Sequence, residues 1–294
     1  MAQSEWTAAR LKALYPGAAV EIIGMTTKGD QILDKSLSQI GGKGLFIKEL
    51  EVALEENRAD IAVHSMKDVP MTLPDGFSAI VVGEREDVHD AFVSNRYGGI
   101  DELPQGAIVG TSSLRRESQL RFRRPDLKIV ALRGNVNTRL AKLDEGQYDA
   151  IILAAAGLKR LGFEQRIRAR LDRQHFLPAI AQGALGIEYQ SHRADVATWL
   201  APFATAETTA VVGAERALGR ALTASCDVPL GGHATLRNGV LELDAFIAMP
   251  DGTQMIRDRI SGAPGDAAQL GTSLAEKLLA AGGDRILASL SRHA

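Results

Sequence analysis

The sequence predicts an α/β fold with two lobes of similar size, followed by a smaller α+β domain at the C-terminus. The first observation is length, because 294 residues exceed the size at which one hydrophobic core usually keeps growing. The second is an alternation of short apolar runs with helical patterns between residues 45 and 189. The third is a change after residue 234 to strands separated by Asn238-Gly239 and Asp251-Gly252, which are hairpin turn signals.

The first lobe begins with a predicted helix over residues 4–15, where the helical spacing of apolar residues ends at Pro16-Gly17. A strand is predicted over residues 19–23. The glycine-rich segment Gly41 to Gly44 precedes a predicted helix over 45–57, and Val69-Pro70 separates predicted strands over 60–64 and 77–83. This order is typical of a βαβ unit.

The second lobe has four predicted strands and two predicted helices. The strands cover 91–94, 107–110, 128–132 and 149–155, and the helices cover 113–122 and 136–143. The longest apolar run, Ala150 to Leu158, is too short to span a bilayer and is typical of a buried parallel strand.

A further strand over 183–189 is predicted to return to the first lobe, and such a crossing usually creates a cleft between lobes. Helices over 207–221 and 267–280 belong to the third domain. We therefore expect lobe 1 at residues 1–85 and 183–203, lobe 2 at 88–180, and the C-terminal domain at 205–294.

The charge is balanced overall but not locally. The net charge is −2, yet residues 115–139 hold eight Lys and Arg residues against Glu117 and Asp126. A local excess of this kind predicts a surface that binds anions. The N-terminus shows no basic region followed by an apolar core, so we expect no secretory signal and a cytoplasmic protein.

The single cysteine, Cys226, lies on a loop just after the predicted helix 207–221. With no second cysteine, neither an internal disulfide nor a Cys-x-x-Cys site can form. Free cysteine is often a buried hydrophobe, so Cys226 is either core filler or a reactive thiol. His233 lies seven residues later, but a nucleophilic dyad also needs spatial reach and an orienting third group.

Two segments share one design, in which a strand leads into a polar loop and then a helix with arginine in its first turn. They run from Gly110 to Arg116 and from Leu132 to Arg139. Helix N-termini and arginine bind phosphate or carboxylate, although Ser and Thr there can simply cap the helices. Because both segments follow presumed parallel strands, we expect an anionic ligand in the crevice.

Ser65 to Pro70 leaves the end of another buried strand, which places Lys67 and Asp68 where open α/β sheets hold ligands. An ionised Asp68 suits the stabilisation of a cation, whereas a surface ion pair or a turn cap is the simpler interpretation. The segment Gly41 to Gly44 lacks the spacing of a phosphate loop and suggests a lid instead. His64 is expected to be a hydrogen-bonded core residue.

Together these segments resemble the hydroxymethylbilane synthase family, also called porphobilinogen deaminases. The resemblance covers nearly the whole chain. It is carried by GGKGLF at 41–46, DIAVHSMKDVP at 60–70, GTSSLRR at 110–116, LRGN at 132–135 and CDVP at 226–229.

The resemblance implies two lobes like those of type II periplasmic binding proteins and a third domain that bears the cysteine. It assigns Cys226 the role of anchoring a dipyrromethane primer through a thioether. It assigns Asp68 the catalytic role of stabilising the azafulvene cation that forms when porphobilinogen loses ammonia. Four porphobilinogens are then joined head to tail on the primer, and the linear tetrapyrrole is released by hydrolysis.

Each pyrrole carries an acetate and a propionate, which implies many cations in the cleft. By the matching motifs, the residues expected to bind the cofactor are Cys226, Lys67, Ser65, Arg115, Arg116, Thr111 and Ser113. Those expected to bind substrate are Arg133, Arg139, Arg160, Gln182 at the lobe crossover and Lys43 on a mobile loop. The family implies a monomer that needs no metal or nucleotide.

Three departures from the family pattern bear on activity. Relatives begin with a strand and an Arg-x-Ser-Pro-Leu-Ala segment, whereas this chain starts inside the helix that follows, so weaker carboxylate binding is expected. Gln39 replaces a lysine found in relatives, and Ala224-Ser225 replaces frequent glycines.

Two alternatives stay open. One is a two-lobed module that binds an organic anion without turnover. The other is nucleic-acid binding through residues 115–139, which have Phe122 as their single aromatic residue and therefore lack a stacking platform.

Overall fold

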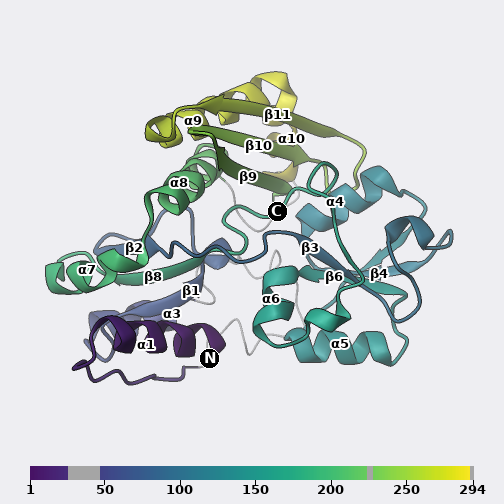
Figure 1. Cartoon of the computed structure of the whole chain (residues 1–294). Coiled ribbons are helices and arrows are strands. Elements are labelled where there is room, and N and C mark those ends of the chain that lie inside the picture. The colour runs from purple at the N-terminus through teal and green to yellow at the C-terminus, as the bar shows by residue number, and fades with distance from the viewer. Residues whose placement is uncertain (26–46, 224–227, 292–294) are drawn as a thin grey trace.

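The computed structural model describes residues 1–25, 47–223 and 228–291. These residues form three β-sheets, each packed against helices, and Figure 1 shows the third sheet lying across the first two. No helix in the described ranges is long and apolar enough to cross a bilayer. The mixed α/β class predicted from the sequence is confirmed.

The first sheet has the strand order β1-β8-β2, with β8 antiparallel to both neighbours. Its strands are β1 (Ala62–Ser65), β2 (Phe77–Val81) and β8 (Leu185–Gln190). Helices α1 (Ala2–Leu14), α3 (Lys48–Glu55) and α7 (Ala194–Leu200) pack against it. The predicted return of the chain to the first lobe is confirmed, because the late strand β8 lies between the two early ones.

The strand predicted over residues 19–23 is wrong. Residues 18–25 have no regular secondary structure, and Ile23 is 48% exposed. An apolar run becomes a strand only when a neighbouring strand accepts its hydrogen bonds, and none of the described strands of the first sheet pairs with this segment.

The second sheet has the order β5-β4-β6-β3-β7, in which β4 is parallel to β5 and β6 and β3 is antiparallel to β6 and β7. The strands are β3 (Asp90–Val93), β4 (Ile108–Gly110), β5 (Lys128–Val130), β6 (Ala150–Ala154) and β7 (Ala169–Arg170). Its helices are α4 (Leu114–Arg123), α5 (Val136–Asp144) and α6 (Ala155–Arg160). The apolar run 150–158 is therefore a parallel strand joined directly to a helix, a boundary that hydrophobicity alone does not mark.

Both faces of the second sheet are covered, which explains why β6 is apolar at every position and β3 at every position after Asp90. Phe92 and Ile152 face one core with Leu120 of α4, whereas Val93 and Ile151 face the other. Successive side chains along a strand point to opposite faces, so a sheet between two cores loses the polar alternation of a half-exposed one.

The third sheet is an antiparallel meander of order β11-β10-β9. It comprises β9 (Leu230–Arg237), β10 (Val240–Ala248) and β11 (Met255–Gly262), with helices α8 (Ala206–Ala221), α9 (Ala267–Leu278) and α10 (Asp284–Ser291). The predicted hairpin turn at Asn238-Gly239 is confirmed by φ values of 51° and 78° at its two residues. Leu279–Gly283 joins α9 to α10 across a kink, where Gly282 has a φ of 110°.

Glu215 of α8 connects the third sheet to both segments that cross between the other two sheets. Its fully buried carboxylate accepts hydrogen bonds from Arg85 at 2.8 and 3.0 Å, from the Ala181 amide at 2.7 Å and from the Ala234 amide at 2.8 Å. The two crossing segments also touch at Gly183, where φ is +84° and an added Cβ would lie 2.3 Å from the Glu86 carbonyl oxygen. Only glycine fits this contact.

Candidate functional site

The two arginine-bearing segments follow neighbouring parallel strands, so their loops lie side by side at one edge of the second sheet. The loop after β4 is joined to the loop after β5 through Ser112, whose Oγ donates to the Leu132 carbonyl at 2.8 Å. The same Oγ accepts from the Leu132 amide at 3.0 Å. The expectation that both loops open on a common crevice therefore agrees with the strand order.

The polar residues of these two loops have different hydrogen-bonding roles. Asn135 caps α5 by accepting from the Thr138 amide at 2.9 Å, which is an ordinary structural role. The Thr111 hydroxyl, which is buried, accepts from the Ser113 amide at 3.3 Å. Ser113 is the N-cap residue of α4, but its hydroxyl makes no hydrogen bond to the first turn of the helix.

Arg115 and Arg116 are buried and bind a carboxylate that the sequence reasoning missed. Arg115 donates to the two oxygens of Asp90 at 2.6 and 3.1 Å, and Arg116 Nε donates to Oδ1 at 2.9 Å. Gln182 adds a bond to Oδ1 at 3.0 Å and another to the Val88 carbonyl at 2.8 Å. The sequence did contain a signal for this pairing, because Asp90 stands at the start of an apolar strand. Such a carboxylate is expected to be buried, and buried carboxylates are almost always paired with a cation.

Asp90 is held as a carboxylate. Burial by itself raises its pKa, but the charges of Arg115 and Arg116 and their hydrogen bonds outweigh burial and keep the pKa well below its usual range. Both guanidinium groups thus have a fixed counterion and a fixed orientation.

Lys67 and Asp68 lie in a 3-10 turn that directly follows β1, as the sequence predicted for a strand end. The amide of Met66 donates to the Ala184 carbonyl at 3.0 Å, and the Ser65 hydroxyl accepts from Gln3 at 2.7 Å. Asp68 is exposed and, within the described chain, lies more than 4 Å from any cationic nitrogen. The simpler interpretations, a surface ion pair with Lys67 or a turn cap, are not seen.

The turn and the arginine loops share one electrostatic environment. Burial lowers the pKa of Lys67, while the nearby Asp68 raises it and Arg116 lowers it. Asp68 also acts on Arg139, whose pKa falls to about 10 because it is buried close to Arg116 and Arg133. Residues from the first sheet and from the second are therefore brought together here.

Four of the predicted cations have no carboxylate within ion-pair distance among the described residues. Among the described residues, Arg139 donates to the Gly134 carbonyl at 2.7 Å and Arg160 to the Gly183 carbonyl at 3.3 Å. Burial lowers the pKa of Arg133 and of Arg160. Together with Lys67, these half-buried cations can neutralise several carboxylates of a ligand.

The remaining candidate residues lie outside the described residues or away from this group of cations. Lys43, Cys226 and the whole Gly41–Gly44 segment lie outside the described residues. His64 is a buried core residue, as expected, with Nε2 2.8 Å from Glu188. His233 lies 3.3 Å from Glu215, a partner that the sequence did not reveal.

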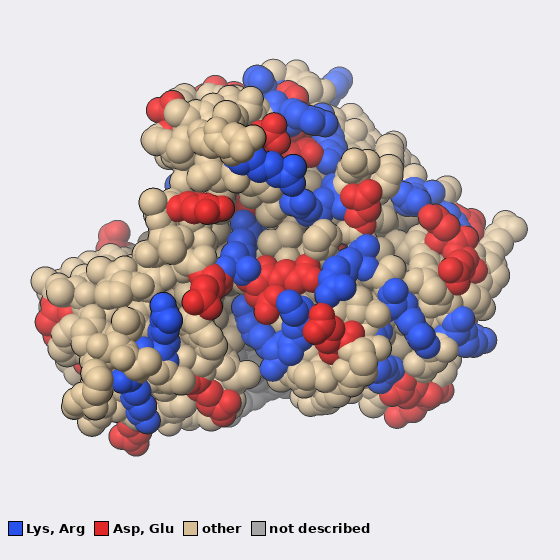
Figure 2. Space-filling view, viewed as in Figure 1, with Lys and Arg blue, Asp and Glu red and all other residues tan. Residues whose placement is uncertain are grey.

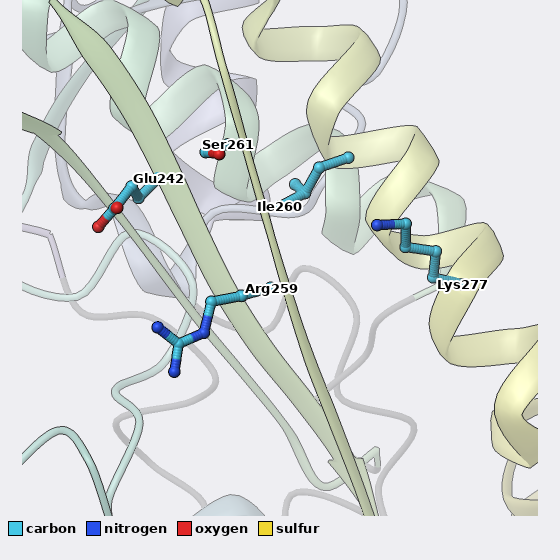
Figure 3. A pocket seen from close by; sticks show the side chains of 5 residues that line it. All are labelled: Glu242, Arg259, Ile260, Ser261 and Lys277. Atoms are coloured by element: carbon cyan, nitrogen blue, oxygen red, sulfur yellow. The ribbon is translucent and has the colours of Figure 1, made fainter.

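The third sheet carries two cavities that involve none of the predicted site residues. A cavity of about 320 Å³ is lined by Glu242, Arg259, Ile260, Ser261 and Lys277; Figure 3 shows Ile260 pointing toward the helix and Arg259 away from it. A neighbouring cavity of about 550 Å³ shares Glu242 and Arg259. Their linings mix both signs of charge, unlike the cations around Asp68.

The face seen in Figure 2 is not uniformly basic. Figure 2 shows Lys and Arg side chains interspersed with Asp and Glu side chains over the face in view. On α4 and at its C-cap, Arg121 pairs with Glu117, Arg123 with Asp101, and Arg124 with Asp126. Much of the basic excess of residues 115–139 is therefore neutralised within the fold.

Comparison with known proteins identifies the family of this chain. Residues 1–198 match the family model "Porphobilinogen deaminase, dipyromethane cofactor binding domain", and residues 209–280 match the model of its C-terminal domain. The porphobilinogen deaminase of Chromobacterium violaceum is 58% identical over 290 residues, which cover 99% of this chain and 94% of the relative. That of Nitrosomonas europaea is 57% identical over 289 residues, covering 98% and 94%.

Among solved structures, the periplasmic VFT2 domain of Bordetella pertussis BvgS is similar to 67% of this chain and 74% of its own length, with 19% identity and a TM-score of 0.39. The two family models together span most of the chain, and the curated relatives match it almost from end to end. The chain is therefore a transferase that belongs to the porphobilinogen deaminase family.

Proposed function

We propose that this chain joins four porphobilinogen molecules head to tail on a cysteine-linked dipyrromethane primer, releases ammonia at each step and then frees the linear tetrapyrrole by hydrolysis. The observation that carries the proposal is a set of half-buried cations that have no carboxylate partner among the described residues, two of which, Lys67 and Arg139, feel the charge of Asp68, in a member of this family.

The cation set fits a primer of two pyrrole rings, each with an acetate and a propionate. Lys67, with Ser65, Thr111 and Ser113 at the strand ends, would hold the primer's carboxylates. Arg115 and Arg116 would contribute through N–H groups that Asp90 leaves free. When bound through Cys226, the primer supplies the ring position to which the first substrate is joined.

Substrate carboxylates would bind the guanidinium groups of Arg133, Arg139 and Arg160, which have no carboxylate partner among the described residues, and, by family motif, Lys43. Gln182 would act indirectly, because its amide is bonded to Asp90 and to Val88 at the crossing segment. Binding several carboxylates fixes the ring's orientation before any bond changes.

Asp68 would be the catalytic residue. Its exposed carboxylate projects from a turn that lacks a competing ion pair in the described chain, so it is available to accept pyrrole N–H bonds. A carboxylate so placed stabilises positive charge on the substrate ring as ammonia departs. The neighbouring Lys67, whose burial lowers its pKa, offers a cation for an adjacent acid group.

We propose further that the protein is a cytoplasmic monomer, with lobes at 1–85 plus 183–203 and at 88–180 and a C-terminal domain at 205–294. Nucleic-acid binding is disfavoured by the ion pairs along α4. An anion-binding module without turnover has the same cations but needs neither Cys226 nor Asp68.

Intact mass under denaturing conditions tests the proposal. The purified protein is expected to carry an excess of two pyrrole units on Cys226 and to gain single units when porphobilinogen is added. Cys226→Ala should lose the excess, and Asp68→Asn should keep it but stop gaining units. Asp75→Asn, at an exposed carboxylate on the following loop, is the matched control and should behave as the parent. A mass that never exceeds the polypeptide would favour the binding module.

A further inference from the structure

Arg216, on helix α8 of the third domain, is bonded to the chain just after the turn that bears Asp68. Its Nη2 donates to the Pro70 carbonyl at 2.6 Å and to the Met71 carbonyl at 3.1 Å, and its Nη1 donates to the Val69 carbonyl at 3.3 Å. The side chain is only 7% exposed. A buried guanidinium group thus binds three consecutive carbonyl groups and no described carboxylate.

The contact adds hydrogen bonds to a region in which Val69 and Met71 already pack with α8 in one hydrophobic cluster. Burial, with Arg220 close by, lowers the pKa of Arg216 to about 10, so placing a cation here is unfavourable by itself. In the described chain no other donor reaches the three carbonyl oxygens. Hydrogen bonds from a charged donor to buried carbonyl groups are stronger than hydrogen bonds between neutral groups. The Arg216 guanidinium group can therefore hold residues 69–71 in one position.

The turn at Met66–Asp68 is consequently fixed at both ends. Upstream, the Met66 amide is bonded to the Ala184 carbonyl at 3.0 Å, on the segment that returns to β8. Downstream, Arg216 holds the next three residues from the third domain. Asp68 itself is exposed, so its position depends on its backbone anchors.

Helix α8 is also the element that leads to Cys226, which follows its last residue, Ala221, by five positions. We propose that Arg216 is a positioning residue that sets Asp68 relative to α8, the helix that precedes Cys226 in the chain, so that a growing chain anchored on Cys226 meets the carboxylate in one register. The inference rests on the proposed function. It assigns the third domain a part in the condensation step beyond carrying the primer.

The test uses two variants and one control, Arg220→Met. Arg216→Met removes the hydrogen-bond donors. Arg216→Lys keeps the positive charge but loses the two Nη groups that bind neighbouring carbonyl groups together. Arg220 lies one turn further along α8 and is exposed. For each variant, intact mass gives the fraction of molecules that carry primer, and kcat is expressed per loaded molecule. Normalising in this way removes any loss that comes only from poor folding.

We expect Arg216→Met to lower kcat per loaded molecule by about 10- to 100-fold, because an error near 1 Å in a reacting group costs about this much. KM should stay within about threefold, since the substrate cations are untouched. Arg216→Lys should recover part of kcat. If Arg216→Met does not fold, Arg216→Lys decides.

The inference would be overturned if Arg216→Met had a kcat per loaded molecule within about twofold of the Arg220→Met control. Where only Arg216→Lys folds, the same criterion applies to that variant. Failure of the proposed function gives a different result. In that case Asp68→Asn also keeps normal condensation, or the parent carries no primer.

Discussion

Replacing Asp90 with asparagine tests the buried charge centre most directly. Asp90 is fully buried and accepts hydrogen bonds from Arg115 at 2.6 and 3.1 Å, from Arg116 at 2.9 Å and from Gln182 at 3.0 Å. Asparagine keeps the shape but removes the charge and turns one acceptor into a donor that faces guanidinium N–H groups. Two buried cations then have no counterion.

The expected loss follows from that geometry. Removing one partner of a buried ion pair costs about 3–5 kcal/mol, because the remaining charge stays buried without compensation. Here one carboxylate serves two arginines, which places the expected loss at the upper end of that range. For a chain of this length such a loss lowers the melting temperature by about 5–8 °C.

Thermal unfolding followed by circular dichroism, together with urea titration, measures the effect. The matched control is Asp101→Asn, which removes a surface carboxylate 2.9 Å from Arg123 and is expected to cost less than about 1 kcal/mol. A melting temperature for Asp90→Asn within about 2 °C of that control would refute the reasoning. The two arginines would then be stabilised by something other than Asp90.

Two further predictions concern packing and pH. Gly271→Ala should destabilise the fold by about 1–3 kcal/mol, because its Cβ would lie 2.4 Å from the Ala214 carbonyl oxygen, whereas Gly213→Ala, with nothing within 4 Å, should be neutral or stabilising in urea titrations. Burial lowers the pKa of His233, so the unfolded chain takes up a proton more readily and the free energy of unfolding falls as pH drops below about 6.5. His233→Gln should flatten that slope between about pH 6.5 and 5 by up to about 1.4 kcal/mol per pH unit, and an unchanged slope, or an equal change in the exposed control His175→Gln, would contradict the assignment.

Local pattern was sufficient for most elements. Helices over 113–122 and 136–143 were predicted and lie at Leu114–Arg123 and Val136–Asp144, because helical spacing, polar loops and turn glycines act within a few residues. The same holds for the third-sheet hairpin at Asn238-Gly239, whose conformation depends on those two residues alone. Because polar loops follow predicted strands in the sequence, we also expected Lys67 and the two arginine-bearing segments, Gly110 to Arg116 and Leu132 to Arg139, at strand ends.

Pairing between distant segments was beyond local pattern. The predicted strand at 19–23 failed because a strand exists only where a partner accepts its hydrogen bonds. The short helix α6 was missed because the apolar run 150–158 does not mark where the buried strand ends.

By itself, the sequence determined which residues are cationic, which loops follow strands and, through its ordered motifs, which family the chain resembles. Only the tertiary structure decided which cations are neutralised internally. Arg115 is occupied by Asp90, 25 residues away, and Arg85 by Glu215, 130 residues away, whereas Arg139 is left without a described carboxylate. The physical reason is that ion pairing depends on distance and burial in space, and residues far apart in the chain become neighbours only when the sheets have assembled.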